Sequence, residues 1–180
     1  MLRDLTKELV LVLGGAKSGK SSWALRYTES SYRSYLFLAT AEIKDEEMRE
    51  RVSRHRQQRR AEWQLLEEPI EIAEALEGKI SGPEAVLIDC LTLWQTNVML
   101  QRGADQVKSY QGRLLSALEK KKQAVIIVSN EVGTGIVPEN ALGRRFRDYA
   151  GELNQKVAAL ADRVVFVVAG LPIFLKGQSG

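Results

Sequence analysis

Residues 9–22 read LVLVLGGAKSGKSS, and this stretch decides the fold of the chain. The apolar run 9–13 predicts a buried strand, and the residues that follow Ser21 predict a helix. Between them, Gly14 to Ser21 have the spacing G-x-x-x-x-G-K-S of a phosphate-binding loop. A glycine turn with an unrelated lysine is the alternative, but strand, loop and helix occur in the order that such a loop requires. The stretch therefore predicts that the chain binds a nucleoside triphosphate.

The chemistry of this loop lies mostly in its backbone. Glycines allow a concave turn of N–H groups and a close approach of phosphates, and the following helix adds the positive end of its dipole. Lys20 is expected to reach the outer phosphates as a catalytic cation, while the Ser21 hydroxyl completes the ligand shell of Mg²⁺. The predicted nucleotide-binding residues of the loop are Gly14, Gly15, Ala16, Lys17, Ser18, Gly19, Lys20 and Ser21.

Composition sets limits on the class of protein. The 180 residues are expected to form a single domain, 1–180, with a sizeable core. A net charge of +3 does not by itself indicate nucleic-acid binding. The one cysteine, Cys90, lies in an apolar run and is expected to be a buried structural thiol, which suits a reducing compartment. We expect a cytoplasmic protein with no membrane span, because no stretch approaches the roughly 20 apolar residues of a span and residues 1–7 lack the apolar centre of a signal peptide.

Continuous apolar runs predict a mostly parallel sheet. Buried strands are expected at residues 9–13, 35–39, 85–89, 124–129 and 163–169, since both faces of such strands are covered. A further run, 173–175, follows Gly170-Leu171-Pro172 so closely that we expect it to return antiparallel. Helical stretches separate the first five runs. The chain therefore reads as an α/β doubly wound fold of the phosphate-loop class.

In sheets of this kind, ligands bind beyond the carboxyl ends of the strands. The small residues Ala39, Thr40 and Ala41 follow the second strand and would let a nucleotide lie close. Asp89 ends the third strand, where it would bind Mg²⁺ or, as the alternative, cap the next helix. Asn130 and Glu131 follow the fourth strand. They would either position substrate or satisfy a loop that turns on its glycines.

Residues 43–60 predict a basic helix. The segment contains six arginines between residues 49 and 60 and the only histidine of the chain, His55. At 100° per residue, His55 continues a stripe with Met48 and Val52 that should face the protein. From the pattern alone this is either a solvated basic helix or a phosphate-binding site in which arginines hold the anion.

A second long helix is predicted at residues 139–162. Its apolar face is expected in the core and consists of Leu142, Phe146, Tyr149, Leu153, Val157 and Leu160. The opposite face is a substrate or subunit surface or is simply solvated, and it carries Arg144, Arg147, Asp148, Gly151 and Gln155.

Taken together, these segments resemble one family, the bifunctional adenosylcobinamide kinase / adenosylcobinamide-phosphate guanylyltransferases of cobalamin assembly. The resemblance runs from about Leu9 to Lys176. It rests on the loop 14–21, Ala39-Thr40-Ala41, residues 51–56, Trp63, Glu67, residues 90–94, Asn97, residues 129–138, residues 146–148, Gly151, Asn154 and Gln155. The family usually has proline after the arginine that corresponds to Arg59, and this chain has Arg60 instead, which bears on where the helix ends.

The resemblance implies a RecA-like fold, a homotrimer and two reactions. Adenosylcobinamide is phosphorylated with ATP or GTP, and GMP is then transferred from GTP to adenosylcobinamide phosphate through a guanylylated histidine. His55 occupies the position of that histidine. Beyond the loop 14–21, the family's nucleotide contacts fall on Ala39, Thr40, Ala41, Arg56, Gln57, Gln58, Arg59, Glu67 and Asp89.

Two other functions remain compatible with parts of the pattern. A kinase of another small molecule would use the phosphate loop and leave His55 without a role. A RecA-like nucleic-acid-binding ATPase would use the arginine-rich helix as its contact surface and would bind with a steep salt dependence. The modest net charge of +3 gives that second function little support.

Overall fold

One sheet organises the structure, a computed structural model that describes residues 7–42, 46 and 62–177. The strand order is β3-β2-β4-β5-β1-β6-β7. The strands are β1 (Leu9–Gly14), β2 (Tyr35–Ala39), β3 (Gln64–Glu67), β4 (Ala85–Asp89), β5 (Ala124–Asn130), β6 (Arg163–Val168) and β7 (Leu171–Lys176). All neighbours pair in parallel except β6 and β7, which pair antiparallel. The predicted mostly parallel α/β sheet with a returning last strand is confirmed.

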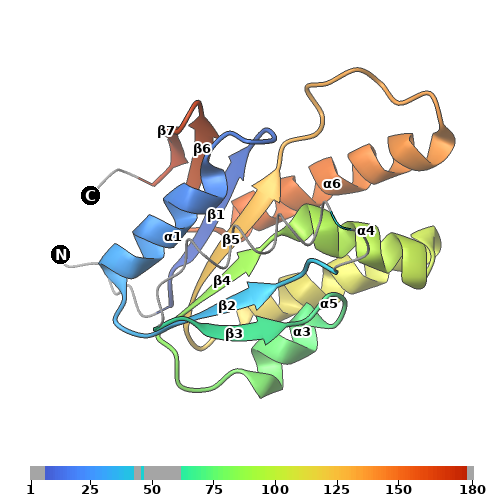
Figure 1. The fold of residues 1–180 in the computed structure, drawn as a ribbon. Helices are drawn as coiled ribbons and strands as arrows, with labels where there is room; N and C mark the ends of the chain where they lie inside the picture. The colour runs from blue at the N-terminus through green and yellow to red at the C-terminus, as the bar shows by residue number, and fades with distance from the viewer. Residues whose placement is uncertain (1–6, 43–45, 47–61, 178–180) are drawn as a thin grey trace.

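Helices cover both faces of this sheet (Figure 1). Helix α1 (Lys20–Ser31) lies on one face. The other face carries α3 (Ile72–Glu74) with its continuation η2 (Ala75–Lys79), α4 (Leu91–Gln101), η3 (Ala104–Gln106), α5 (Val107–Glu119) and α6 (Ala141–Leu160).

The apolar runs are continuous because alternate residues enter two different cores. In β1, Leu9 and Leu11 belong to the core beneath α4, α5 and α6, whereas Val10 belongs to the core beneath α1. All three side chains are fully buried. A strand covered on both faces needs apolar side chains at every position, which explains why the run does not alternate. Cys90, just after β4, is buried as predicted.

One strand was not predicted. β3 spans only Gln64–Glu67, and three of its four side chains are exposed. It pairs with β2 at the edge of the sheet, with Leu36 opposite Gln64 and Ala39 opposite Glu67. β3 has a neighbouring strand on one side only, and most of its side chains are exposed. Its residues therefore need not be apolar, and the sequence contains no apolar run that would predict it.

Helix α6 begins and ends close to the predicted bounds, but its apolar face was predicted too long. Leu153 and Val157 are buried, and Phe146 and Tyr149 pack against the core. The prediction that Leu142 lies in the core is wrong, since 50% of its surface is exposed. Figure 1 shows the reason: the first turn of α6 lies beyond the end of the sheet. Within the described part of the chain, no helix combines the length and apolar character needed to cross a membrane.

Candidate functional site

Strand register brings the predicted nucleotide contacts to one edge of the sheet. Gly14 lies opposite Asn130 in the pairing of β1 with β5. Ala39 lies opposite Asp89 on one side and opposite Glu67 on the other. The carboxyl ends of β3, β2, β4, β5 and β1 therefore lie side by side. This is the edge at which α/β sheets bind ligands.

The phosphate loop turns as its sequence requires. Lys17 and Gly19 both have left-handed backbone conformations, with φ of 54° and 92°. The N–H of Ser18 donates to the Gly15 carbonyl at 3.3 Å, which closes the turn. Residues in such conformations orient successive N–H groups toward a common centre, and α1 begins directly afterwards.

The hairpin of β6 and β7 supports this loop from behind. The N–H of Gly170 donates to the Ser18 carbonyl at 2.8 Å. A Cβ atom at Gly14 would lie 2.6 Å from the Val167 carbonyl oxygen and 2.5 Å from the Ser18 hydroxyl, and one at Gly19 would lie 3.1 Å from the Cα atom of Gly170. The two motif glycines are thus required by backbone packing as well as by phosphate access.

Lys20 and Asp89 lie in the same charged environment. The Lys20 ammonium donates to the Gly15 carbonyl at 2.9 Å, and its side chain is buried. The pKa of the Cys90 thiol is raised to about 11, and burial is the largest cause. The negative charge of Asp89 contributes to this rise and the positive charge of Lys20 opposes it, so both charges lie close enough to act on the same thiol.

The side chain of Thr40 joins the ends of β2 and β4. It is fully buried, and its hydroxyl donates to the Cys90 carbonyl and accepts from the Cys90 N–H, both at 2.8 Å. The Asn97 amide donates to the Thr40 carbonyl at 2.8 Å. A nucleotide over Ala39 and Ala41 would therefore meet small residues on a fixed backbone rather than the Thr40 hydroxyl.

Asn130 and Glu131 hold their own loop. The Asn130 amide donates to the Thr92 hydroxyl at 2.6 Å, and the Asn154 amide donates to the Asn130 carbonyl at 3.2 Å. The Glu131 carboxylate accepts from the Gly133 N–H at 2.6 Å. Asn130 and Glu131 were predicted either to position substrate or to form hydrogen bonds within their loop. The structure shows the hydrogen bonds.

Sequence reasoning assigned no individual role to the buried polar residues that stand behind the site. Thr92, Gln95 and Asn97 are all nearly inaccessible on α4, whose other buried residues are apolar. Thr92 contacts the Cys90 sulfur at 3.1 Å as well as Asn130. The polar residues within the otherwise apolar run LTLWQTNVML could have predicted these contacts, because a buried polar group requires a hydrogen-bond partner.

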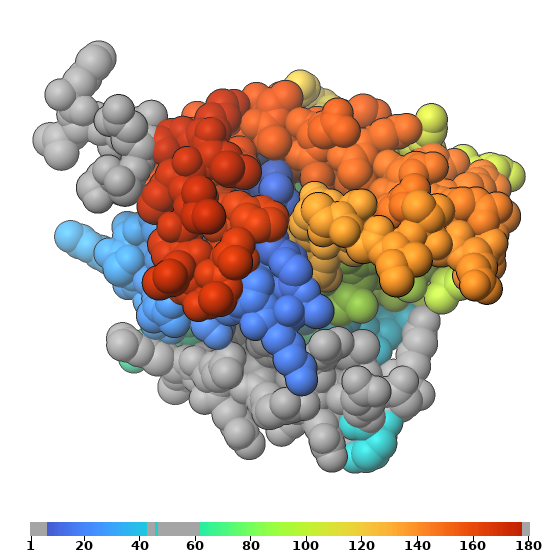
Figure 2. All heavy atoms as spheres, turned by 90° about the horizontal axis from the view of Figure 1, so that it is seen from above, coloured from blue at the N-terminus to red at the C-terminus, as the bar shows by residue number. Residues whose placement is uncertain are grey.

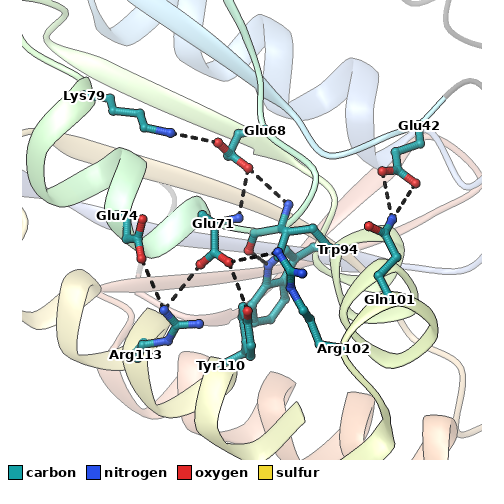
Figure 3. A network of polar contacts seen from close by, with 11 residues as sticks. Glu42, Glu68, Glu71, Glu74, Lys79, Trp94, Gln101, Arg102, Tyr110 and Arg113 are labelled. Carbon is teal, nitrogen blue, oxygen red and sulfur yellow. Dashed lines mark hydrogen bonds and ion pairs between the residues drawn. The ribbon is translucent and has the colours of Figure 1, made fainter. Parts of the chain in front are cut away.

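A network of acids and cations fixes the turn that follows Glu67 (Figure 3). Partial burial alone would raise the pKa of Glu68, but hydrogen bonds from the Glu71 N–H, the Lys79 ammonium and the Ile70 N–H outweigh it and leave that pKa lowered. Glu71 accepts from the Tyr110 hydroxyl at 3.0 Å. Its carboxylate also pairs with Arg102 at 3.7 Å and Arg113 at 3.3 Å.

The remaining predicted residues lie outside the described part of the chain. They are His55, Arg56, Gln57, Gln58 and Arg59. The residues on either side of the gap are placed: the Gln101 amide donates to both oxygens of Glu42 at 2.8 Å, and the Trp63 indole donates to Glu29 at 2.9 Å.

The donors at this edge suit a nucleotide with Mg²⁺. The Ser18 hydroxyl is buried with no hydrogen-bond partner among the described residues. Ser21 and Asp89 offer a hydroxyl and a carboxylate, which are hard oxygen ligands. No group of three or more His, Cys, Asp or Glu side chains that could hold a metal occurs in residues 7–42, 46 and 62–177, so Mg²⁺ there would complete its shell with water and phosphate oxygens.

Comparison with known proteins identifies the family. Residues 10–175 match the family described as cobinamide kinase / cobinamide phosphate guanyltransferase. The chain belongs to this family. The predicted enzyme class, a kinase and guanylyltransferase, is thereby confirmed.

Curated relatives match over nearly their whole length. The bifunctional adenosylcobalamin biosynthesis protein CobP of Pseudomonas aeruginosa is 43% identical over 168 residues, which are 93% of this chain and 97% of that protein. The corresponding protein CobU of Escherichia coli is 38% identical over 181 residues, with 93% and 99% covered. CobU of Salmonella typhimurium is 34% identical with the same coverage.

Solved structures confirm the fold. One of them, an ATPase domain, superposes with a TM-score of 0.54 at 15% identity, covering 97% of this chain and 78% of that one. A KaiC-like protein from Pyrococcus horikoshii gives a TM-score of 0.50 at 12% identity, covering 89% and 70%. This chain thus shares the RecA-like phosphate-loop architecture with distant ATPases.

Proposed function

We propose that this chain phosphorylates adenosylcobinamide with ATP or GTP and then transfers GMP from GTP to adenosylcobinamide phosphate, giving adenosylcobinamide-GDP. The observation that carries the proposal is the strand register that gathers Gly14, Ala39, Asp89 and Glu67 at one edge. Family membership supports the choice of acceptor. We further propose a single-domain, cytoplasmic homotrimer that uses Mg²⁺.

In the proposed first reaction, the phosphate loop holds the triphosphate. The acceptor hydroxyl attacks the terminal phosphorus, and the bond to the leaving diphosphate breaks. Lys20 and the loop N–H groups stabilise the charge on the transferring group, which is the main task of a kinase site. Bound Mg²⁺ would neutralise phosphate charge between Ser21 and Asp89.

The proposed second reaction proceeds in two displacements. A ring nitrogen of His55 attacks the α-phosphorus of GTP, an N–P bond forms and pyrophosphate leaves. An oxygen of adenosylcobinamide phosphate then attacks the same phosphorus and releases the histidine. A covalent intermediate splits one difficult transfer into two easier ones. Arg56, Gln57, Gln58, Arg59 and Glu67 are proposed as nucleotide contacts, with Ala39, Thr40 and Ala41 beside the base or ribose.

The substitution His55→Ala tests the division between the two reactions. We expect it to abolish guanylyl transfer and the acid-labile label that α-labelled GTP leaves on the enzyme, because His55 is the only histidine. Phosphorylation of adenosylcobinamide should persist, since it needs no covalent enzyme intermediate. Both activities are measured in one preparation, and circular dichroism checks that it is folded.

His55→Asn is the matched control, because it keeps a polar side chain but cannot form the N–P bond. It should behave as His55→Ala does. Label retained on either variant would exclude His55 as the nucleophile. Loss of both reactions in a folded variant would make His55 a residue of nucleotide binding instead.

A further inference from the structure

Large apolar side chains are exposed in the segment between β5 and α6. Ile136 is 97% exposed, Val137 is 55% exposed, and Leu142 in the first turn of α6 is 50% exposed. We call these three residues the 136–142 apolar group. Single exposed apolar residues are ordinary, but several within one short segment indicate a surface that binds something.

The backbone around this group is held in place on both sides. Toward its start, Glu131 accepts from the Gly133 N–H. Toward its end, the Arg144 guanidinium donates to the carbonyls of Pro138, at 3.1 Å, and Glu139, at 2.5 Å. Asn140 caps α6 by accepting from the Gly143 N–H at 2.6 Å. These bonds hold the apolar side chains outward instead of letting them collapse onto the core.

The segment adjoins the phosphate loop at its first residue, Glu131, and leads from there to the start of α6 (Figure 1). The N–H of Glu131 donates to the Gly14 carbonyl at 3.1 Å, so the segment begins on the first residue of the loop. Figure 2, which looks onto this edge, shows the light-orange atoms of residues 131–140 beside the blue atoms of the phosphate loop. An acceptor whose hydroxyl reaches a triphosphate on this loop would lie close to the start of the segment, and a large acceptor would extend along it.

The size and character of the group favour a small-molecule occupant. These three side chains alone supply less than the roughly 800 Å² per side that a stable contact between two protein copies needs. Ligand sites combine apolar side chains with a few backbone donors and acceptors. A corrin ring presents methyl groups and amide arms around its rim, which match apolar side chains and a loop backbone respectively.

We infer that residues 131–140 and the first turn of α6 bind the corrin ring of the acceptor, with Ile136 and Val137 packed against its apolar rim. The inference rests on the proposed function and gives that function a substrate-binding surface. Ile136 is the best single probe because it is almost fully exposed, so its substitution removes nothing from the core.

Ile136→Ala tests this assignment through the Kd for adenosylcobinamide, measured by equilibrium dialysis with visible absorbance. We expect the Kd, and the KM of the kinase reaction, to rise about tenfold, because three carbons lose an apolar contact. The KM for GTP should stay within about twofold. Ile136→Leu should restore the Kd. Leu100→Ala, at an exposed apolar position of α4, is the matched control and should leave the Kd unchanged.

An unchanged Kd in Ile136→Ala overturns the inference, and so does an equal rise in Leu100→Ala. A lower association state of Ile136→Ala by sedimentation, with the Kd unaltered, would assign the group to a subunit contact and also overturns it. The proposed function fails separately, if wild-type protein binds adenosylcobinamide but never phosphorylates it.

Discussion

Asp89 is the carboxylate proposed to bind Mg²⁺ beside the triphosphate. In Asp89→Asn the shape is kept and the charge is lost, so the Mg²⁺ concentration for half-maximal activity should rise by about tenfold or more. Asp105→Asn is the control, because that carboxylate is 92% exposed in an ion pair with Arg145. A Mg²⁺ titration that does not move in Asp89→Asn would make Asp89 a structural residue at the start of α4.

Residues whose role depends on local backbone geometry were predicted correctly from the sequence. Residues whose role depends on side-chain contacts in the folded chain were not. Gly14 and Gly19 were found because the spacing of the loop dictates their geometry. The role of Thr40 was not, since its hydroxyl bonds to Cys90, 50 residues away along the chain. Bonds between distant residues depend on the completed sheet, and no local pattern records them.

At the scale of elements, the loop after β1 and the hairpin of β6 and β7 form one packed unit. Gly14→Ala should lower the free energy of unfolding by about 1–3 kcal/mol, because the added Cβ meets the Val167 carbonyl. Gly15→Ala is the matched control, since nothing lies within 4 Å of its Cβ position. Urea unfolding without nucleotide measures both. Equal stability of the two variants would show that the hairpin moves aside without cost.

Strands and helices were predicted correctly where both of their faces are covered. The predictions failed at the edge of the sheet and at the exposed end of a helix. The central strands β2 and β4 have the predicted bounds, because their apolar runs are continuous. β3 at the edge of the sheet and Leu142 at the free end of α6 were mispredicted. In both cases the deciding quantity is what lies next to the segment, which depends on chain topology rather than on local composition.

At the scale of the molecule, three weakly acidic groups, one thiol and two phenols, lie at opposite edges of the sheet. Cys90 is at the carboxyl edge, close to Asp89. Tyr27 and Tyr32 donate to the buried Glu8 at the other edge, at 2.5 and 3.3 Å. Burial raises the pKa of both tyrosines, and the Glu8 carboxylate raises it further. Each of the three groups is therefore neutral in the folded chain at pH values where it would ionise in the unfolded chain.

This arrangement predicts a loss of stability in alkali. The pKa of Cys90 is raised from 9.0 to about 11, so its contribution is complete below about pH 9 and is lost as the pH rises toward 11. Two pKa units correspond to a contribution of about 3 kcal/mol. In Cys90→Ala the free energy of unfolding should therefore fall less steeply between pH 9 and 11 than in the wild type. The cavity left by the thiol shifts the whole curve and leaves its slope unchanged, and both tyrosines contribute equally to the two proteins. Parallel curves over this window would show that the thiol ionises as readily in the folded chain as in the unfolded one.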